Sequence, residues 1–215
     1  QALLALSAGR DRARPDWVVP SFSLESVWES IYSNGLAADL ANSFLIVAGK
    51  RDGSLDFLQQ TNSFAWHYSV ERHPAYATAK RFALEEGKVA VTRECLQPQP
   101  APAVPVMHHV ENEIYVNGRL WWTSLVDVVN TPGWSAADVC GWARRWLDAL
   151  CEQADLGPAV ALSLDKEVPG TMFDWTPMNC IETPDGKLRF FDRDWEIQSR
   201  LTRSYLVLRG LVGSW

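Results

Sequence analysis

The stretch 174–195, DWTPMNCIETPDGKLRFFDRDW, constrains the fold of this chain more than any other. Its turn signal, Thr183-Pro184-Asp185-Gly186, separates two short apolar runs, which is the pattern of a β-hairpin. Asp174 and Asn179 precede the first run, and Asp192 follows the second. Because the strands of a hairpin lie side by side, we expect Asn179 and Asp192 to meet at one end of it, facing one cleft.

The composition describes a folded chain without a basic tract. The length of 215 residues suits one domain, or one domain with an appendage, and eleven tryptophans favour an aromatic-rich interior. With a formal charge of −6 and no Lys/Arg run, nucleic acid is not an expected partner. No apolar run reaches the length of a transmembrane helix. The four cysteines form no C-x-x-C pair, which is typical of reduced thiols in a cytoplasmic protein.

The expected elements run from strands to helices, so we predict an α+β fold. Helical spacing predicts helices over 23–34, over 120–130, from Ser135 onward and in the C-terminal tail, while strand-like runs occupy 64–70, 89–93 and 114–116. Ser135 with Asp138 forms a capping-box-like helix start. The proline-rich segment 97–105 predicts an extended connector. We therefore expect an arm and helix over 1–35, a β region over 36–118, and a helical region with the loop and hairpin over 119–215.

The residue types around the hairpin suit phosphoryl transfer from ATP. A hydroxyl that attacks the γ-phosphate needs a nearby carboxylate to orient it and accept its proton, and Asp174 is our candidate. Magnesium prefers hard oxygen ligands, of which Asn179 offers an amide oxygen and Asp192 a carboxylate. Strand alternation points Asp194 to the same face as Asp192, as a second metal ligand or as a solvated charge.

The same residues resemble motifs of the protein-kinase-like superfamily, above all of its aminoglycoside-phosphotransferase-like branch. Asp174, Pro177 and Asn179 match its D-x-x-P-x-N loop, and the segment 191–195 is similar to its I-D-[FLW]-[DE] metal segment. The resemblance implies a two-lobed kinase-like fold with an abbreviated N-lobe sheet and a truncated helical C-lobe. It also implies ATP and Mg²⁺ as cofactors, and a small-molecule or glycan hydroxyl as the acceptor.

A second resemblance concerns the C-terminal part of the chain. The segment 192–195, DRDW, and the segment 205–211, YLVLRGL, are similar to kinase-like domains fused behind methyltransferases in bacterial surface-glycan biosynthesis. The segment 14–20 resembles the exit from such a methyltransferase. This resemblance implies an upstream methyltransferase domain as a partner, and this chain is then a piece of a longer protein.

The chain departs from the kinase pattern at the elements that bind phosphate. It has no G-x-G-x-x-G loop and no clean match to the β3 lysine, so Arg93 and Lys88, at the two ends of the strand-like run, are the nearest candidates for contacting the nucleotide. These departures motivate a second hypothesis, a degenerate kinase fold that serves as a binding or scaffold module. A third hypothesis takes 192–194 as the D-x-D motif of nucleotide-sugar transferases, but the preceding helices and short tail disfavour it. The four histidines lack ligand spacing, so we expect them to be structural.

Overall fold

The computed structural model describes residues 24–37, 39–40, 50–51, 62–70, 72–98, 106–158 and 163–213. The chain divides into two compact units, Gln1–Ser54 and Leu55–Trp215. In the first unit helix α2 spans Leu24–Ser33, as the apolar spacing predicted. The arm predicted over 1–20, most of the apolar segment 36–48 and most of the connector 97–105 lie outside the described residues.

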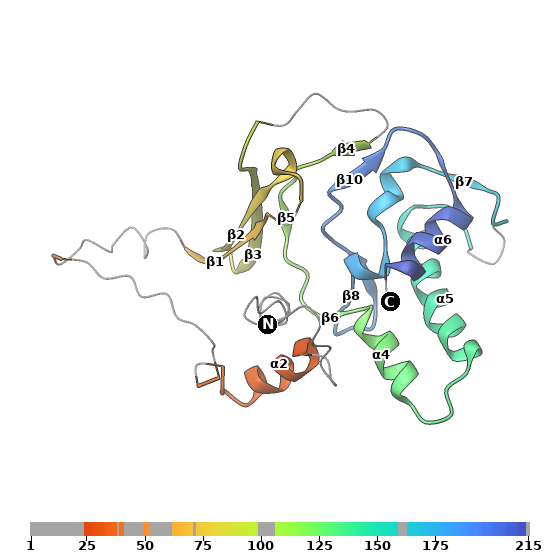
Figure 1. The fold of residues 1–215 in the computed structure, drawn as a ribbon, viewed down its shortest axis with the longest axis horizontal. Coiled ribbons are helices and arrows are strands. Elements are labelled where there is room, and N and C mark those ends of the chain that lie inside the picture. Colours follow the sequence, from red (N-terminus) through yellow and green to blue (C-terminus); the bar gives the residue numbers. More distant parts are fainter. Residues whose placement is uncertain are drawn as a thin grey trace. The chain divides into compact units, whose positions relative to one another are not determined.

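The second unit begins with an antiparallel sheet of strand order β1-β2-β3-β5 (Figure 1). Its strands are β1 (Ser63–Ser69), β2 (Thr78–Glu85), β3 (Lys88–Cys95) and β5 (Glu113–Ile114). The predicted strands over 64–70 and 89–93 are confirmed as β1 and β3. Glu86 and Gly87 join β2 to β3 with φ of 50° and 77°, the left-handed pair that a two-residue hairpin turn requires. Strand β2 was not predicted, because its inward and outward residues do not alternate in polarity.

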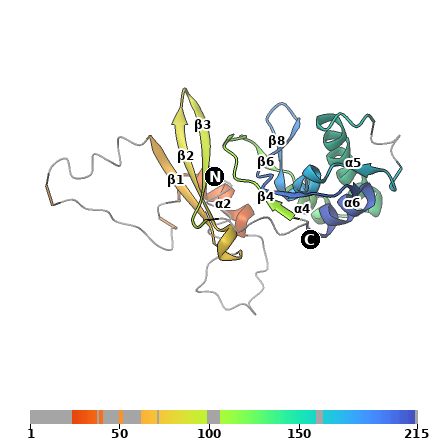
Figure 2. The same ribbon diagram turned by 90° about the horizontal axis from the view of Figure 1, so that it is seen from above.

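The rest of the second unit is largely helical. Helices α4 (Thr123–Asn130), α5 (Ala136–Gln153) and α6 (Arg203–Val212) accompany a small antiparallel sheet, β6-β8-β9, of Arg119–Leu120, Cys180–Glu182 and Leu188–Phe190. Figure 2 shows these helices together, with the long strands β1 to β3 forming a separate layer. The backbone N–H of Ser135 donates to the Asp138 carboxylate at 2.8 Å, which confirms the predicted helix start. Strands β8 and β9 form the predicted hairpin, and the N–H of Gly186 closes its turn on the carbonyl of Thr183.

Four short strands that the sequence did not predict complete the unit. Strand β4 (Val106–His108) pairs with β10 (Trp195–Ile197), and β7 (Glu167–Val168) pairs with β11 (Leu201–Thr202). Since β4 lies between β3 and β5 in the chain, the first pairing connects the β1-β2-β3-β5 sheet to the segment that follows the hairpin. The described residues thus form a mixed α+β fold with four α-helices and several small antiparallel sheets. None of the helices described is long and apolar enough to cross a membrane.

The main hydrophobic core lies among the helices and the hairpin. Trp146 of α5 and Leu206 of α6 are completely buried at its centre. The indole N–H of Trp146 donates to the backbone carbonyl of Trp175 at 3.0 Å, so a core side chain holds the loop after Asp174. Gly210 of α6 lies so close to Trp146 that a Cβ there would come within 2.5 Å of the ring. Core packing therefore fixes the loop on which the candidate site is built.

Candidate functional site

The side-chain amide of Asn179 links the two acidic positions that the sequence singled out. Asp174 ends the 3₁₀-helix η3 (Gly170–Asp174), and Asn179 ends the next one, η4 (Pro177–Asn179). Nδ2 of Asn179 donates to the backbone carbonyls of Asp174, at 3.0 Å, and Asp192, at 3.2 Å. The hairpin thus brings Asn179 and Asp192 together, as the sequence predicted. The amide oxygen of Asn179 remains available as an acceptor or ligand, because both bonds use its nitrogen.

The Asp174 carboxylate is buried and held from two sides. Its Oδ2 accepts a hydrogen bond from the backbone N–H of Trp195 at 2.9 Å, and its Oδ1 accepts one from Nη2 of Arg209 at 3.1 Å. Burial raises the pKa of Asp174 above the usual range, and the hydrogen bond from Arg209 partly opposes this shift. Each carboxylate oxygen has a second lone pair, so the carboxylate keeps the capacity to accept a further proton or hydrogen bond in a fixed orientation.

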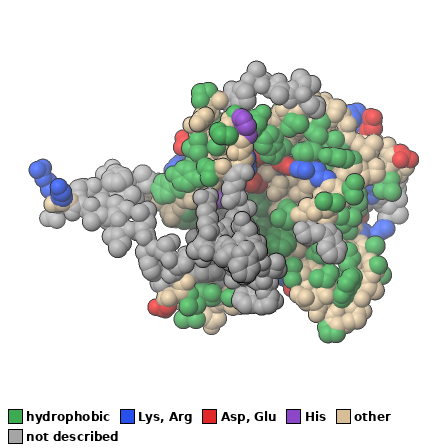
Figure 3. Space-filling model, in the orientation of Figure 1, with side chains coloured by type: hydrophobic (Ala, Val, Ile, Leu, Met, Phe, Trp, Pro, Cys, Tyr) green, Lys and Arg blue, Asp and Glu red, His purple; other side chains and the backbone are tan. Residues whose placement is uncertain are grey.

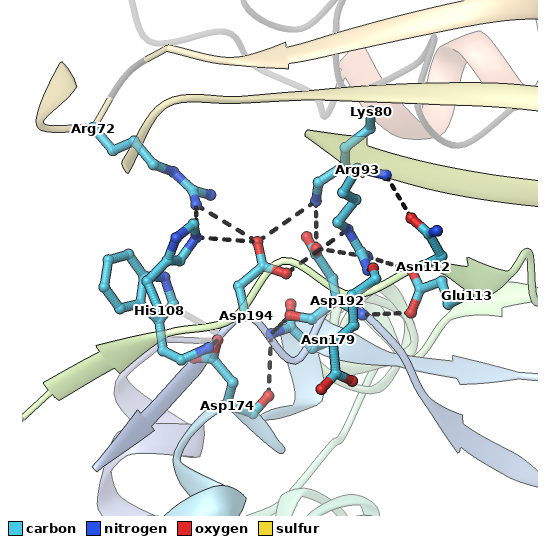
Figure 4. Close-up of polar contacts among 12 residues, drawn as sticks. Arg72, Lys80, Arg93, His108, Asn112, Glu113, Asp174, Asn179, Asp192 and Asp194 are labelled. Carbon is cyan, nitrogen blue, oxygen red and sulfur yellow. Dashed lines mark hydrogen bonds and ion pairs between the residues drawn. The ribbon is translucent and has the colours of Figure 1, made fainter. Parts of the chain in front are cut away.

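Two buried cations of the sheet meet the Asp192 carboxylate. Lys80 of β2 and Arg93 of β3 are register partners on adjacent strands, and their side chains are only 7% and 4% exposed. Lys80 forms an ion pair with Oδ1 of Asp192, and Nη2 of Arg93 lies 3.0 Å from the same oxygen (Figure 4). Burial alone would raise the pKa of Asp192, but the charges of Lys80 and Arg93 outweigh it and hold that pKa below its usual range. Asp192 therefore stays ionised, and at 28% side-chain exposure it is more accessible than Asp194.

Asp194 is the buried member of the acidic pair. Its side chain is 5% exposed, and its oxygens lie 3.5 Å from Nη1 of Arg72, 4.0 Å from Nζ of Lys80 and 3.8 Å from Nε of Arg93. Burial and the neighbouring charge of Asp192 raise the pKa of Asp194 to about 6. Asp194 and Asp192 face the same cations, as alternation predicted, although residues 191–194 are not in a strand. The reading of Asp194 as a solvated charge is wrong, since the side chain is enclosed.

The structure does not bring Lys88 to this cluster. Lys88 is exposed at the start of β3, beside the hairpin turn, and pairs in register with Glu85. Lys88 lies five positions before Arg93 along an extended strand, which corresponds to roughly 17 Å. Lys80, which the sequence interpretation missed, occupies the buried position instead. Reading Glu86-Gly87 as a two-residue hairpin turn would have paired β2 with β3 and placed Lys80 opposite Arg93.

The cluster has two further members, Glu113 and His108. The sequence did not indicate Glu113, and it predicted only a structural role for His108. Glu113 of β5 forms an ion pair with Arg93 and accepts a hydrogen bond from the backbone N–H of Asp192 at 3.3 Å. His108, expected to be structural, is buried at 1% side-chain exposure, with its Nε2 3.2 Å from Nη1 of Arg72. Burial and the charge of Arg72 lower the pKa of His108 to about 4, so the neutral ring accepts the hydrogen bond from Arg72. Nothing local in the sequence marks either contact, because both partners are distant along the chain.

A cavity of about 300 Å³ lies beside the Asp174 loop. Its walls include the side chains of Trp175 and Trp195, and its polar groups include Glu111, Arg193 and Glu196. Figure 3 shows acidic and basic side chains adjacent to one another on a face that is otherwise largely apolar. The backbone N–H of Trp195 is also the donor to the Asp174 carboxylate, so this cavity and the candidate catalytic carboxylate share a residue.

Comparison with models of protein families, with curated proteins and with solved structures finds no match to this chain. Within the part of the chain that the structure describes, no three His, Cys, Asp or Glu side chains gather in a way that could hold a metal ion. Inference about function therefore depends on the geometry around Asp174, Asn179 and Asp192 and on the cations of the sheet.

Proposed function

We propose that this chain is an ATP- and magnesium-dependent phosphotransferase that acts on a hydroxyl of a small molecule or glycan. In this proposal the fold is kinase-like, with the β1-β2-β3-β5 sheet as the N-lobe and the helices α4 to α6 in the C-lobe. The observation that carries the proposal is the Asn179 amide, which joins Asp174 to Asp192 at the point where two buried cations reach Asp192.

The proposed role of Asp174 is to orient the acceptor and take its proton. The acceptor oxygen forms a bond to the γ-phosphorus while the bond from that phosphorus to the β–γ bridging oxygen breaks, so ADP leaves. The proton of the hydroxyl passes to Asp174, whose raised pKa makes it a better base than an ordinary carboxylate. Its two fixed hydrogen bonds, from Trp195 and Arg209, support a role that depends on orientation.

In this proposal the amide oxygen of Asn179 and the carboxylate of Asp192 supply magnesium with a pair of oxygen ligands. Magnesium is commonly held by one or two protein carboxylates together with substrate phosphates and water, so a cluster of three acidic side chains is not required. A magnesium ion held here would neutralise charge on the transferring phosphate. Asp192 is the more exposed of the two acidic residues, whereas the burial of Asp194 suits it better to balance Lys80 and Arg93 than to reach a metal.

Lys80 and Arg93 are the proposed contacts to the nucleotide phosphates. Both are buried on neighbouring strands and lie beside Asp192, which places positive charge where phosphates would approach. Without ligand the two cations pair with Asp192 itself. When Mg-ATP binds, Lys80 and Arg93 would pair with phosphate oxygens in place of the Asp192 carboxylate. Both cations would therefore have an anionic partner before and after binding.

Calorimetric titration with Mg-ATP tests this function. We expect binding by the wild type that requires magnesium, and a loss of at least about tenfold in affinity in Asp192→Asn, because a charged ligand is removed. Asp148→Asn, an exposed carboxylate of α5, is the matched control and should bind normally. Asp174→Asn should bind Mg-ATP but lose transfer. A folded wild type that binds no Mg-ATP would contradict the proposal.

The alternative is a degenerate kinase fold that acts as a scaffold, associated with a methyltransferase. One observation favours it: Lys80 and Arg93 already satisfy the Asp192 carboxylate, which stabilises the site without a ligand. In addition, only residues 96–105 separate β3 from β4, which is short for a connecting helix. Failure of the wild type to bind Mg-ATP, together with capture of a methyltransferase domain by the purified chain, would support this alternative.

A further inference from the structure

The cavity beside Asp174 has the character of a site for a neutral ring rich in hydroxyl groups. We propose that it binds one monosaccharide unit, which presents the acceptor hydroxyl. The transfer step in this inference rests on the phosphotransferase function proposed above, whereas sugar binding by the cavity does not. The argument depends on the two aromatic walls, the mixed polar groups, the volume and the link to Asp174.

The two aromatic walls, Trp175 and Trp195, pack against rings that do not line the cavity. The ring of Trp175 stacks on Phe190, with ring centroids 5.1 Å apart. The ring of Trp195 packs edge-on against Tyr76 at 5.1 Å and lies 4.5 Å from the ring of His108. Because these contacts restrict the two indoles, little entropy is lost when a ligand packs against them. The fixed indole face of Trp195 suits the apolar C–H face of a sugar ring, which carries its hydroxyl groups at the rim. The guanidinium of Arg193 lies over the Trp175 ring, so Trp175 serves as a side wall.

The polar groups of the cavity both accept and donate hydrogen bonds. Glu111 and Glu196 provide carboxylate acceptors for hydroxyl protons, and Arg193 provides N–H donors. Glu196 is positioned by Nε2 of His109 at 2.7 Å. The backbone carbonyl of Glu111 accepts a hydrogen bond from Arg93, which connects this wall to the Asp192 cluster. Hydroxyl groups are both donors and acceptors, so a polyol can use each of these partners.

The charges argue against an ionic ligand. The lining holds two carboxylates, the guanidinium of Arg193 and the imidazole of His109, which pairs with Glu196, so it has no excess positive charge to attract an anionic acceptor. A cation is disfavoured at the Trp175 wall, because the guanidinium of Arg193 already lies 5.3 Å from the centroid of that ring. The volume of about 300 Å³ is at the lower end for small-molecule pockets, which suits a single ring. A neutral monosaccharide unit meets all these conditions.

The position of the cavity links binding to the proposed chemistry. The Trp195 backbone N–H holds the Asp174 carboxylate at 2.9 Å while the Trp195 side chain lines the cavity. Asp174 does not itself line the cavity, and Trp195 is the residue that connects the two. In this inference the bound ring presents one hydroxyl to the Asp174 carboxylate on the far side of that connection. That hydroxyl oxygen would take the γ-phosphoryl group, ADP would leave, and the product would be a sugar phosphate.

Saturation-transfer difference NMR tests the site without nucleotide. The probes are methyl glycosides of glucose, mannose, galactose and N-acetylglucosamine, with tetramethylammonium and methyl phosphate as ionic probes whose methyl protons report binding. We expect transfer to at least one glycoside and none to the ionic probes. Glu196→Gln should weaken that binding about tenfold, since it removes a charge-assisted hydrogen bond. Glu152→Gln, an exposed carboxylate of α5, is the matched control and should leave binding unchanged.

The outcomes separate this inference from the function on which it rests. Folded protein that binds Mg-ATP but no glycoside overturns the sugar site and leaves the phosphotransferase proposal intact. Preferred binding of tetramethylammonium or methyl phosphate, or glycoside binding that Glu196→Gln does not change, also overturns it. Glycoside binding that Glu196→Gln weakens supports the site, even if no phosphate is transferred. If glycoside binds in this way but no phosphate is transferred, the phosphotransferase proposal fails and the cavity remains a sugar site.

Discussion

For the substitution Gly210→Ala, helix propensity and tertiary packing predict opposite changes in the free energy of unfolding. By propensity alone, Gly210→Ala in α6 should stabilise the protein by up to about 1 kcal/mol. In the fold, however, the new Cβ would lie 2.5 Å from Cη2 of Trp146 and 3.1 Å from Cδ of Pro177. Trp146 is fully buried and hydrogen-bonded to the loop, so it has no room to retreat. We expect packing to dominate and Gly210→Ala to lower the free energy of unfolding by about 1–3 kcal/mol.

Urea denaturation followed by tryptophan fluorescence measures this change, and Gly141→Ala provides a matched control. Gly141 lies in α5, and a Cβ there would meet nothing within 4 Å. The control should therefore gain about 1 kcal/mol, because only propensity acts. Pro177 lies between Asp174 and Asn179, so Gly210→Ala should also weaken Mg-ATP binding while Gly141→Ala does not. Equal stabilisation by both substitutions would refute the packing argument.

Three further predictions concern the cluster and the loop. Lys80→Met should lower the free energy of unfolding by about 2 kcal/mol in urea denaturation, since it leaves carboxylates without a buried partner. Lys80→Met/Asp192→Asn should recover part of that loss, and strict additivity would contradict the coupling. The lowered pKa of His108 makes the free energy of unfolding increase as pH rises from about 4 to 6.5, because only the unfolded chain binds the proton there. The raised pKa of Asp194 makes it decrease as pH rises from 3.8 to about 6, because only the folded chain binds that proton. Because Asp194→Asn removes the opposing group, the variant should lose about 3 kcal/mol more than the wild type on acidification from pH 6 to pH 4, measured by denaturation at each pH. Gly170→Ala should lower the melting temperature sharply in thermal denaturation, because its Cβ would strike the carbonyl oxygens of Ile197, at the end of β10, and Ser199. An unchanged melting temperature would contradict that close approach.

Local patterns of the sequence were sufficient for the elements that depend on neighbouring residues. The hairpin of β8 and β9 followed from its turn residues, and the start of α5 from Ser135 and Asp138. The apolar spacing predicted a helix in the tail, which is α6, but Tyr205, Leu208 and Val212 of that spacing are exposed and Leu206 and Gly210 form the buried face. The same local pattern predicted that Asn179 would lie beside Asp192, because the hairpin between them fixes their separation. Each of these predictions required only residues within about fifteen positions of one another.

Long-range contacts decided the rest. Lys80 reaches Asp192 across 112 residues of sequence, and His108 lies beside Asp194 because β4 pairs with β10. Strands as short as these carry too few residues for a polarity pattern, so only packing against a partner forms them. The sequence by itself therefore determined the helices, the hairpin and the closeness of Asn179 to Asp192, whereas the Asp174 loop is held by the distant residues Trp146 and Arg209. The tertiary structure alone determined which cations face that loop, because buried charges are placed by the partners that compensate for their lost hydration.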